Sequence, residues 1–414
     1  MDQRKNVSQI LKALEDRDTN LVLEDPIENY MVLNIGPQHP ATHGVLRLLV
    51  KLDGETVVDC VPELGFLHRG YEKIAEACSY YEFITHTDRL DYISPLANNV
   101  AYALAVEKIA GVEAPPRAQY IRVISAELAR ISSHLMAIGA MAMDVGAMTV
   151  FLWSFREREK LYDVFDLFTG VRFTTSYTRI GGVAQDIDDK AMQAIKKYID
   201  EFPKNLDEIR RMLNRNRIFL GRTVGVGAIA AQDAIDIGLS GPNIRACGVE
   251  YDLRTFSPYL VYDRLSFDVI TEKEGDCFAR YMVRMREMEE SVKIVRQAID
   301  KIPSGPVKAD LPKKVLPEKE LVYTKMEEMI HDFVIVNDGV SPAVGDTYVA
   351  TEGSKGELGF YIMSDGGGNP WRLKIRAPSF YNLQALPIML KGQMISDVVA
   401  IIGSIDPIMG EADK

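Results

Sequence analysis

Residues 117–146 read RAQYIRVISAELARISSHLMAIGAMAMDVG, and this stretch decides the fold because it is the clearest helical pattern in the chain. It follows Pro115 and Pro116, a pair that marks the start of a helix. Its apolar residues recur every three or four positions, which predicts a seam that packs against other helices. They are Ile121, Ile124, Leu128, Ile131, Leu135 and Ile138. We therefore expect a helical core around this segment.

Helical patterns continue on both sides of this segment, from about Gly70 to Ile302. Beyond them, residues 303–317 are rich in Pro, Lys and Gly and predict an excursion between elements, while residues 382–402 are apolar and helical in pattern. The further helices are predicted at Pro95–Ala110, Phe155–Thr169, Lys190–Asn214 and Glu274–Ile302.

Strand patterns flank the helical region at both ends. Residues 30–61 alternate between strand and turn, with Asp53 and Gly54 at the second turn. Short strands return at residues 344–375, interrupted by the turn-forming run GGGNP at 366–370. The predicted fold class is therefore α+β, with a central helical bundle flanked by N-terminal and C-terminal β modules.

We expect two regions in the chain. Residues 1–28 form an acidic, weakly helical N-terminal extension, and residues 29–414 form a single domain. Within that domain, residues 29–70 are the β module, residues 71–302 are the helical core, and residues 303–414 are a mixed region that completes the core.

The net charge and the distribution of apolar residues exclude several classes of function. The net charge of −11 gives no electrostatic support for binding nucleic acid. No run approaches the ~18 apolar residues of a membrane span, and residues 1–25 lack the apolar region of a signal peptide. Any link to a membrane is therefore expected through a partner.

The four cysteines, Cys60, Cys78, Cys247 and Cys277, form no CxxC pair and match no common zinc or cluster framework. We expect four buried thiols, and no metal or iron–sulfur cluster held by this chain alone. The short glycine runs also lack the pattern of a dinucleotide or phosphate loop, so NADH itself is expected to bind elsewhere.

The stretch GPQHPATHG at residues 36–44 places His39 and His43 in a turn between two strand patterns. Proline fixes φ and glycine permits positive φ, so we expect a shaped turn. Two imidazoles on such a turn suit proton chemistry, while an equally weighted alternative is a hairpin whose histidines cap backbone groups. A metal pair is disfavoured, because Pro40 and Gly44 oppose the helix that would bring the two rings together.

The stretch HTDRLDY at residues 86–92 is dense in polar groups and leads into an apolar helix. Buried polar groups need partners or a polar cavity. The segment is therefore either a structural salt-bridge cluster or a cavity wall in which Tyr92 donates a hydrogen bond to a ligand oxygen.

The long helix carries its own titratable groups. Glu127, Arg130 and His134 lie within reach of one another, although a histidine beside an apolar seam is more often a satisfied core residue than a functional one. Asp144 ends the helix among methionines, and an apolar neighbourhood predicts a raised pKa for its carboxyl. Asp144 is a candidate partner for an imidazole, or alternatively a helix-end cap.

Ten longer motifs carry a resemblance to one known family. They read GPQHPATHGVLR at 36–47, ELGFLHRGYEKIAE at 63–76, THTDRLDY at 85–92, PPRAQYIRV at 115–123, RIGGV at 179–183, GLSGPNIRACG at 238–248, LSFDV at 265–269, KGELGFYI at 355–362, WRLKIRAPSF at 371–380 and GSIDPIMGEADK at 403–414. Together they resemble the D-type or 49-kDa-type subunit of respiratory complex I, the proton-pumping NADH–quinone oxidoreductase. The resemblance covers residues 31–414.

The resemblance implies the fold of the nickel–iron hydrogenase large subunit, which holds its metal with two cysteine pairs, the second in the sequence Asp-Pro-Cys-x-x-Cys. In this chain Asp406 and Pro407 are followed by Ile408 and Glu411 at the cysteine positions. Because thiolates hold the nickel, this departure removes hydrogenase chemistry and leaves the cavity free for another ligand.

In the family that cavity, shared with the cluster-bearing B-type subunit, receives the quinone headgroup. The resemblance implies that His43 and Tyr92 bind the headgroup carbonyls, and that Asp144 is the carboxylate associated with that histidine in a proton relay. The turn from His39 to Gly44 matches a loop that lines the site. Tyrosine and histidine can both donate protons, and Asp144 would favour a charged His43.

The resemblance also places Arg69, Arg89 and His134 near the terminal [4Fe–4S] cluster of the B-type subunit. Cationic Arg69 and His134 would raise the potential of that cluster. FMN and the iron–sulfur clusters are implied for partner subunits, so quinone is the substrate and this chain alone binds no cofactor.

The implied activity is NADH:quinone oxidoreductase coupled to proton translocation, with this chain as one subunit. The implied partners are the B-type subunit, the C-type and other peripheral-arm subunits, and the H-type subunit of the membrane arm, at the cytoplasmic side of the inner membrane. Two alternatives stay open: the same role in a complex fed by ferredoxin or reduced F420, and a non-catalytic scaffold that only docks the B-type subunit.

Overall fold

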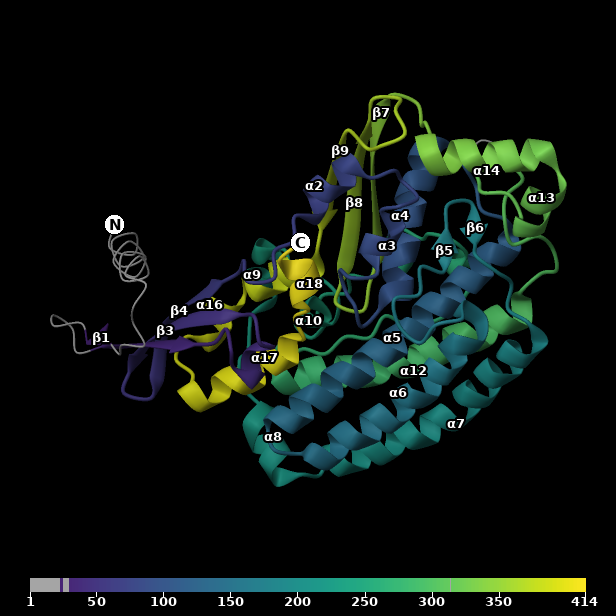
Figure 1. Cartoon of the computed structure of the whole chain (residues 1–414). Helices are drawn as coiled ribbons and strands as arrows, with labels where there is room; N and C mark the ends of the chain where they lie inside the picture. The colour runs from purple at the N-terminus through teal and green to yellow at the C-terminus, as the bar shows by residue number, and fades with distance from the viewer. Residues whose placement is uncertain (1–22, 25–29, 313) are drawn as a thin grey trace.

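The computed structural model describes residues 23–24, 30–312 and 314–414 of the chain (Figure 1). Four long helices lie side by side and form the helical core. They are α5 (Pro116–Asp144), α6 (Met148–Thr169), α7 (Asp189–Leu213) and α12 (Cys277–Lys301). Helix α5 packs against α6 and α12, and α7 packs against both of those helices.

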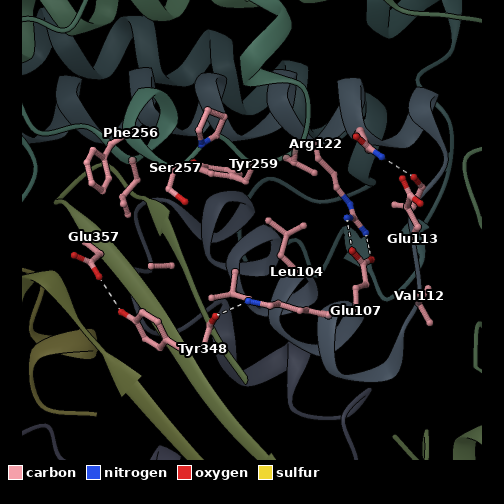
Figure 2. Close-up of a pocket in the computed structure, with 18 of the residues that line it drawn as sticks. Leu104, Glu107, Val112, Glu113, Arg122, Phe256, Ser257, Tyr259, Tyr348 and Glu357 are labelled. Carbon is pink, nitrogen blue, oxygen red and sulfur yellow. Dashed lines mark hydrogen bonds and ion pairs between the residues drawn. The ribbon is translucent and has the colours of Figure 1, made fainter. Parts of the chain in front are cut away.

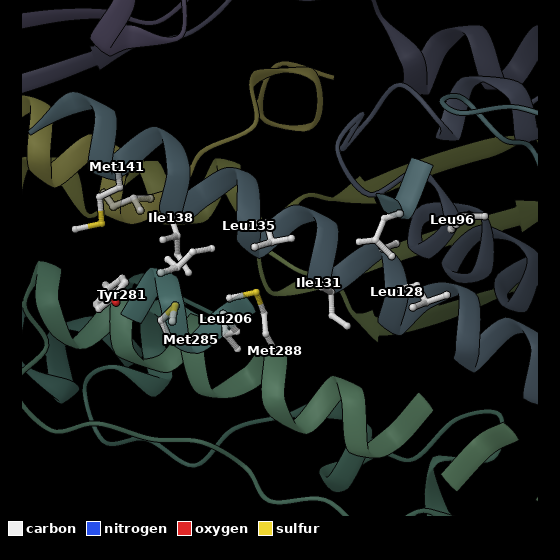
Figure 3. Close-up of a cluster of buried hydrophobic side chains, with 14 of the residues drawn as sticks. Leu96, Leu128, Ile131, Leu135, Ile138, Met141, Leu206, Tyr281, Met285 and Met288 are labelled. Carbon is white, nitrogen blue, oxygen red and sulfur yellow. The ribbon is translucent and has the colours of Figure 1, made fainter. Parts of the chain in front are cut away.

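Helix α5 carries the predicted seam. Ile131, Leu135 and Ile138 are buried and lie toward Met285 and Met288 of α12 (Figure 3). Each fully buried side chain of this kind stabilises the fold by about 1.5–3 kcal/mol. The seam therefore holds the two central helices of the core together, as its spacing predicts.

Two shorter helices, α4 (Pro95–Ala110) and α17 (Val398–Ile405), cover further sides of α5. As a result, the polar residues in the middle of α5 are buried with the apolar ones. The predicted helices are confirmed, and α4 has the predicted bounds. Helix α6 begins at Met148 rather than at the predicted Phe155. Only residues 145–147 separate it from α5.

The N-terminal β module is an antiparallel sheet with its strands in sequence order: β1 (Leu23–Glu24), β2 (Met31–Ile35), β3 (Arg47–Asp53) and β4 (Thr56–Glu63). The three strands predicted between residues 30 and 61 are confirmed, as is the turn that follows β3. The predicted extension at residues 1–28 lies outside the described residues, apart from the two residues of β1, which form a strand and not a helix.

A second antiparallel sheet supplies the C-terminal strands, β7 (Gly345–Glu352), β8 (Glu357–Ser364) and β9 (Arg372–Arg376). Helix α4 lies against β7 and β8, which joins this sheet to the core. A ribbon of β5 (Thr178–Arg179) and β6 (Gly182–Val183) was not predicted, because strands of two residues offer no period to detect.

The remaining elements are short and connect these layers. The apolar residues 382–402 are divided among four short helices, and Gly392 marks the break between α16 and η3 with a positive φ of 78°. Neither α13 nor α14 was predicted; only Ile335 of α14 is buried, so that helix has no continuous apolar face toward the core. The short elements are α2 (Tyr71–Ala77), α3 (Ile84–Thr87), α8 (Arg217–Thr223), α9 (Ala231–Ile237), α10 (Pro242–Arg245), α11 (Leu253–Phe256), α13 (Lys319–Thr324), α14 (Met326–Asp338), α15 (Pro378–Leu383), α16 (Leu386–Leu390), α18 (Met409–Ala412), η1 (Pro40–Thr42), η2 (Tyr262–Arg264) and η3 (Ile395–Asp397).

The predicted α+β class is confirmed, because the chain combines long helices with two separate antiparallel groups of strands (Figure 1). The likeness to hydrogenase large subunits and the division into domains stay predictions. The four cysteines are free thiols; Cys60, Cys247 and Cys277 are buried as predicted, whereas Cys78 is partly exposed. No helix within the described ranges is long and apolar enough to cross a membrane.

Candidate functional site

The turn at residues 36–44 is as tightly shaped as its sequence predicts. Gly36 has a φ of 86°, and a Cβ at this position would overlap the carbonyl oxygen of Leu46. His39 lies just before η1, and its Nδ1 accepts a hydrogen bond of 3.2 Å from the backbone N–H of Ala41. His39 is therefore the backbone cap that the alternative interpretation of this turn expected.

His43 ends the same turn in the left-handed conformation, with a φ of 54°. The turn packs against α17, which brings His43 near the charged pair of Asp406 and Lys355. Burial lowers the pKa of His43, the charge of Asp406 raises it, and the charge of Lys355 lowers it. The net result is a lowered pKa, which favours a neutral imidazole.

Tyr92 lies between α3 and α4 and packs against the C-terminal segment. A Cβ at Gly410 would lie 3.2 Å from Tyr92 Cδ1 and 2.6 Å from the carbonyl oxygen of Leu90. Burial raises the pKa of Tyr92, and the charges of Asp91 and Asp406 raise it further. The phenol therefore keeps its proton at neutral pH and can donate a hydrogen bond.

Asp144 ends α5, and its carboxyl lies over Gly403 of α17. A Cβ at Gly403 would lie only 2.9 Å from Asp144 Oδ2. Burial raises the pKa of Asp144 to about 6, which confirms the raised value predicted from its apolar neighbourhood. The carboxylate whose charge acts on His43 is Asp406, and the pairing of Asp144 with this imidazole stays a prediction.

The three predicted residues thus meet one short stretch of the chain, residues 403–410. Asp144 lies against Gly403, His43 faces Asp406, and Tyr92 packs on Gly410. They come from a loop, a helix end and an inter-helix turn that are distant in sequence. The arrangement gathers an imidazole, a phenol and a carboxyl whose charge states are all set by burial, which suits the holding and transfer of protons.

Sequence reasoning assigned no role to Lys355 or Asp406. Lys355 is buried in the turn between β7 and β8, and its Nζ donates hydrogen bonds to Asp406 Oδ2 and, at 2.7 Å, to Ser133 Oγ. A buried ammonium group is strongly disfavoured without such partners. The signal in the sequence was a lysine in one turn between Gly353 and Gly356, which does not reveal a partner 51 residues away.

Arg69 and Arg89 are exposed, and both lie close to the imidazole of His86. Arg69 Nη1 donates to the hydroxyl of Tyr71 at 3.3 Å, and Arg89 Nη1 donates to the carbonyl oxygen of Thr85 at 2.5 Å. Burial, then the charges of Arg89 and Arg69, lower the pKa of His86. The two arginines therefore form one positive surface patch.

His134 does not join this patch, because it is fully buried in the helical core. Its Nε2 lies 2.9 Å from Glu287 Oε2 on α12. Burial lowers the pKa of His134 to about 4, despite the raising effect of Glu287. The expectation of a cationic His134 is therefore wrong near neutral pH, since α5 is covered on the sides that would have exposed the ring to water.

The predicted contact between Glu127 and Arg130 is confirmed. Arg130 Nε lies 3.2 Å from Glu127 Oε2, and Arg254 also reaches this carboxylate, at 3.1 Å. The two arginines lower the pKa of Glu127 to about 2 against the opposing effect of burial. This buried network holds α5 to its neighbours and leaves no separate role for its charges.

Among the described residues, no side chain of the polar segment 86–92 forms an ion pair, so the interpretation as a salt-bridge cluster finds no support there. Asp88 accepts a hydrogen bond of 2.9 Å from Asn99 Nδ2, and Asp91 accepts one of 3.0 Å from Ser354 Oγ. Both carboxyls are thus held by neutral donors, and burial raises the pKa of each. The alternative interpretation, in which Tyr92 lines a ligand cavity, stays a prediction.

A cavity of about 730 Å³ lies elsewhere, between α4, β7 and the segment from Tyr251 to Leu260 (Figure 2). The buried pair of Glu107 and Arg122 forms one wall, and Tyr348 stands opposite. None of the residues predicted for the site lines this cavity. In the described part of the chain, no group of three His, Cys, Asp or Glu side chains is placed to hold a metal ion.

Comparisons with known proteins agree with the motifs. The family model described as "Respiratory-chain NADH dehydrogenase, 49 Kd subunit" matches residues 144–414. A D-type subunit of NADH-quinone oxidoreductase from Chloroherpeton thalassium is 58% identical over 100% of this chain and 94% of its own length. The D-type subunit of NADH-quinone oxidoreductase from Salinibacter ruber is 54% identical, covering 94% of this chain and 87% of its own. The protein of the same name from Methylacidiphilum infernorum is 52% identical, covering 99% and 97%.

Proposed function

The chain belongs to the family of the 49-kDa or D-type subunit of respiratory NADH–quinone oxidoreductase, and from that membership we propose that it forms the headgroup-binding part of the quinone site. The enzyme is an NADH:quinone oxidoreductase, and this chain is one of its subunits. The observation that carries the proposal is the meeting of His43, Tyr92 and Asp144 at residues 403–410.

Quinone reduction consumes two electrons and two protons, and each carbonyl oxygen becomes a hydroxyl group. In our proposal Tyr92 donates its phenolic proton to one oxygen and His43 donates an N–H to the other. As negative charge develops on the headgroup, both hydrogen bonds strengthen and stabilise the reduced form. In the neutral state that burial favours, Tyr92 holds a phenolic proton, and His43 passes its N–H proton to the quinone only as its other ring nitrogen takes up a replacement.

Asp144 acts in this proposal as a proton relay at the edge of the site. A carboxyl with a pKa of about 6 can be either protonated or ionised near neutral pH. It can therefore take up a proton and release it within one cycle. The loop from His39 to Gly44 lines the site, and the cap formed by His39 fixes the turn that presents His43.

Electrons must arrive from a partner, because no metal centre belongs to this chain in our proposal. Arg69 and Arg89 form a positive patch on the surface, and we assign it to the face that meets the terminal [4Fe–4S] cluster of the B-type subunit. Positive charge near a cluster favours its reduced form and raises its potential. His134 supplies no positive charge to that cluster, because it is a neutral ring held by Glu287 inside the core.

The wider assembly follows the same proposal. The C-type and other peripheral-arm subunits adjoin the chain, FMN and the iron–sulfur clusters lie in partner subunits, and the H-type subunit of the membrane arm connects the site to the cytoplasmic side of the inner membrane. There the energy of quinone reduction is coupled to proton translocation. Any motion that carries this coupling needs an element with two stable arrangements that both sites bias.

The decisive experiment measures the rate of NADH-driven quinone reduction in membranes that contain the complex with the Tyr92→Phe variant of this chain. Tyr323→Phe, a change at a tyrosine that is 78% exposed, serves as the matched control. The amount of assembled complex and NADH oxidation by an artificial acceptor are measured in parallel. We expect quinone turnover to fall by on the order of 10²-fold, the lower range for loss of a general acid, while the other two quantities persist.

Unchanged quinone turnover in an intact Tyr92→Phe complex would place the headgroup elsewhere and leave this chain as a docking scaffold. The identity of the electron donor is checked separately by the input subunits that co-purify with the chain. Subunits for NADH oxidation support the proposal, whereas a ferredoxin- or F420-binding module in their place contradicts the NADH part of it.

A further inference from the structure

Four ionisable side chains are buried directly behind Tyr92, and the proposed reaction does not yet use them as a group. Asp91, Lys355, Asp406 and Glu411 are each at most 5% exposed. They come from the turn before α4, the β7–β8 turn, the end of α17 and helix α18. Three carboxyls therefore share a dry space with one lysine.

The lysine forms an ion pair with one of the three carboxyl groups. Lys355 Nζ donates to Asp406 Oδ2, so these two charges compensate each other. Arg284 lies on the far side of Asp406, where it donates to the carbonyl oxygens of Ser404 at 2.6 Å and Ile405 at 3.0 Å. Asp406 is thus the carboxylate of the cluster that can stay ionised.

Asp91 and Glu411 are held by neutral donors instead. Ser354 Oγ donates to Asp91 at 3.0 Å, and the backbone N–H of Ser379 donates to Glu411 at 3.0 Å. Burial raises the pKa of both carboxyls, and the charge of Asp91 raises that of Glu411 further. Two carboxyls that repel each other in a dry site do not both ionise, so the pair keeps a proton.

Positive charges on the surrounding elements do not compensate the excess of carboxyl groups over lysine in this cluster. Arg158 of α6 faces both Asp406 and Asp91, and Lys414 faces Glu411. Neither forms an ion pair with Asp91 or Glu411 among the described residues. Tyr92 faces Asp91 and Asp406 and, like His43, contributes no positive charge in its neutral state.

Both carboxyls line one small cavity. Its volume is about 10 Å³, its polar wall residues are Asp91, Ser94, Asn98, Ser354, Lys355 and Glu411, and Ala97, Gly353, Leu358 and Pro378 complete the lining. The hydroxyl oxygen of Ser94 is buried and has no hydrogen-bond partner within the described ranges. A cavity of roughly 10–15 Å³ with two or more polar partners suits one water molecule.

We propose that this cavity holds one water molecule that bridges Asp91, Glu411 and Ser94, and that the pair with its retained proton is the store from which Tyr92 is reprotonated during quinone reduction. The inference rests on the proposed quinone site. The balance is simple: the quinone takes two electrons from the partner cluster and two protons, one from Tyr92 and one through His43, whose other ring nitrogen takes up a replacement proton from solvent. The store passes its proton to the tyrosinate that Tyr92 leaves, and solvent refills the store.

The chemistry of Tyr92 explains why a store is needed. Burial and the neighbouring carboxylates make a tyrosinate unfavourable, so Tyr92 can give up its proton only if another arrives at once. Asp91 and Glu411 act through Tyr92 and not on the quinone itself. They are positioning residues, and a change in them should alter the pH profile more than the affinity for quinone.

The first test is structural and independent of turnover. A high-resolution map of the complete complex should show one water peak within hydrogen-bonding distance of Asp91, Glu411 and Ser94. The peak should disappear in Ser94→Val, which replaces the hydroxyl with one methyl group and adds a second one at this buried site. A cavity without a peak in the wild-type complex overturns the inference.

The second test is the pH profile of quinone reduction in Glu411→Gln, whose amide oxygen can still accept from Ser379. The variant leaves Asp91 free to ionise at lower pH, so turnover should fall by on the order of tenfold at about pH 8 and much less at about pH 6. Glu290→Gln, another change at a buried glutamate, is the matched control and should keep the wild-type profile.

The outcomes separate the two proposals. An unchanged profile in an assembled Glu411→Gln complex, together with collapse in Tyr92→Phe, overturns the proton store and leaves the quinone site intact. Unchanged turnover in Tyr92→Phe overturns the quinone site itself. A uniform loss at every pH in Glu411→Gln, with less assembled complex, assigns Glu411 a structural role and also overturns the store.

Discussion

Asp144 Oδ2 and Gly403 are in direct contact across the α5–α17 interface, where a Cβ on Gly403 would lie 2.9 Å from the carboxyl oxygen. The glycine therefore sets how far the side chain of Asp144 extends over helix α17. The next obstacle, Met141 Cα, lies 3.5 Å from the same Cβ, so only the carboxyl would have to move. This contact couples a residue of the proposed relay to the packing of two helices.

The Gly403→Ala variant should fold and assemble, but its added methyl group should displace the carboxyl of Asp144. The added methyl displaces the free end of one side chain, and alanine also favours the helix, so the effects on stability should offset to within about 1 kcal/mol. Quinone turnover should fall while the amount of complex stays near the wild-type level. A variant that keeps full quinone turnover would show that the position of Asp144 does not matter.

Gly410→Ala should be far more damaging, although the substitution is the same. Its Cβ would lie 2.6 Å and 2.7 Å from the carbonyl oxygens of Leu90 and Arg89, and backbone atoms cannot swing away. We expect a cost at or above the roughly 1–3 kcal/mol typical of overpacking, seen as a lower melting temperature and less assembled complex. Equal behaviour of the two glycine variants would contradict the packing described for Tyr92.

The pKa of Asp144, about 6, predicts a pH-dependent effect on stability. A carboxyl whose pKa is raised in the folded state binds its proton more tightly there than in the unfolded chain. Its ionisation therefore destabilises the fold as pH rises from about 4 to about 6, with no further change above that. Asp144→Asn should raise the melting temperature of the purified complex at about pH 7, and the gain should vanish toward about pH 4. A gain that is constant with pH would count against burial as the cause of the shift.

Lys355→Met should leave Asp406 as an uncompensated buried charge. Breaking a buried ion pair from one side typically costs about 3–5 kcal/mol, whereas replacing both partners with apolar groups costs much less. We therefore expect Lys355→Met combined with Asp406→Asn, which removes the charge and suits the left-handed backbone of residue 406 (φ 57°), to assemble better than Lys355→Met alone. A quantitative blot of the assembled complex measures this, and a double variant that is worse than the single one would refute the pairing.

Arg69→Gln and Arg89→Gln test the assignment of the positive patch. Both arginines are exposed, so stability should change by no more than about 0.5 kcal/mol. Loss of a positive charge near the partner's terminal cluster should lower its midpoint potential, measured by redox titration followed with electron paramagnetic resonance. Arg172→Gln, at another exposed arginine, is the control, and an equal shift there would remove the patch from the cluster interface.

The long helices could be predicted from the sequence because each repeats its apolar residues over many turns. α5 and α12 bury such seams, and α4 even has its predicted bounds. Helix α14 could not be predicted in this way, because its apolar residues are mostly exposed. The two-residue strands β5 and β6 are held by one ribbon pairing and carry no periodic signal.

The candidate site was predictable only in part. His43, Tyr92 and Asp144 lie in distinctive local motifs, so the resemblance to a family could single them out. The pairing of Lys355 with Asp406, and the hydrogen bond from Ser354 to Asp91 across 263 residues, exist only after the chain has folded. The charge state of His134 was mispredicted for the same reason, since spacing along one helix does not reveal what covers it.

The two ends of α5 also fix its length. At one end Arg117 donates to Asp186 at 2.9 Å and to the carbonyl oxygen of Pro303 at 2.9 Å, and at the other end Asp144 lies over Gly403. One residue inserted between them would rotate Asp144 by about 100° around the helix axis and shift it by about 1.5 Å. The helix can therefore accept no insertion or deletion between these two contacts, because its length and rotation set the position of the Asp144 carboxyl.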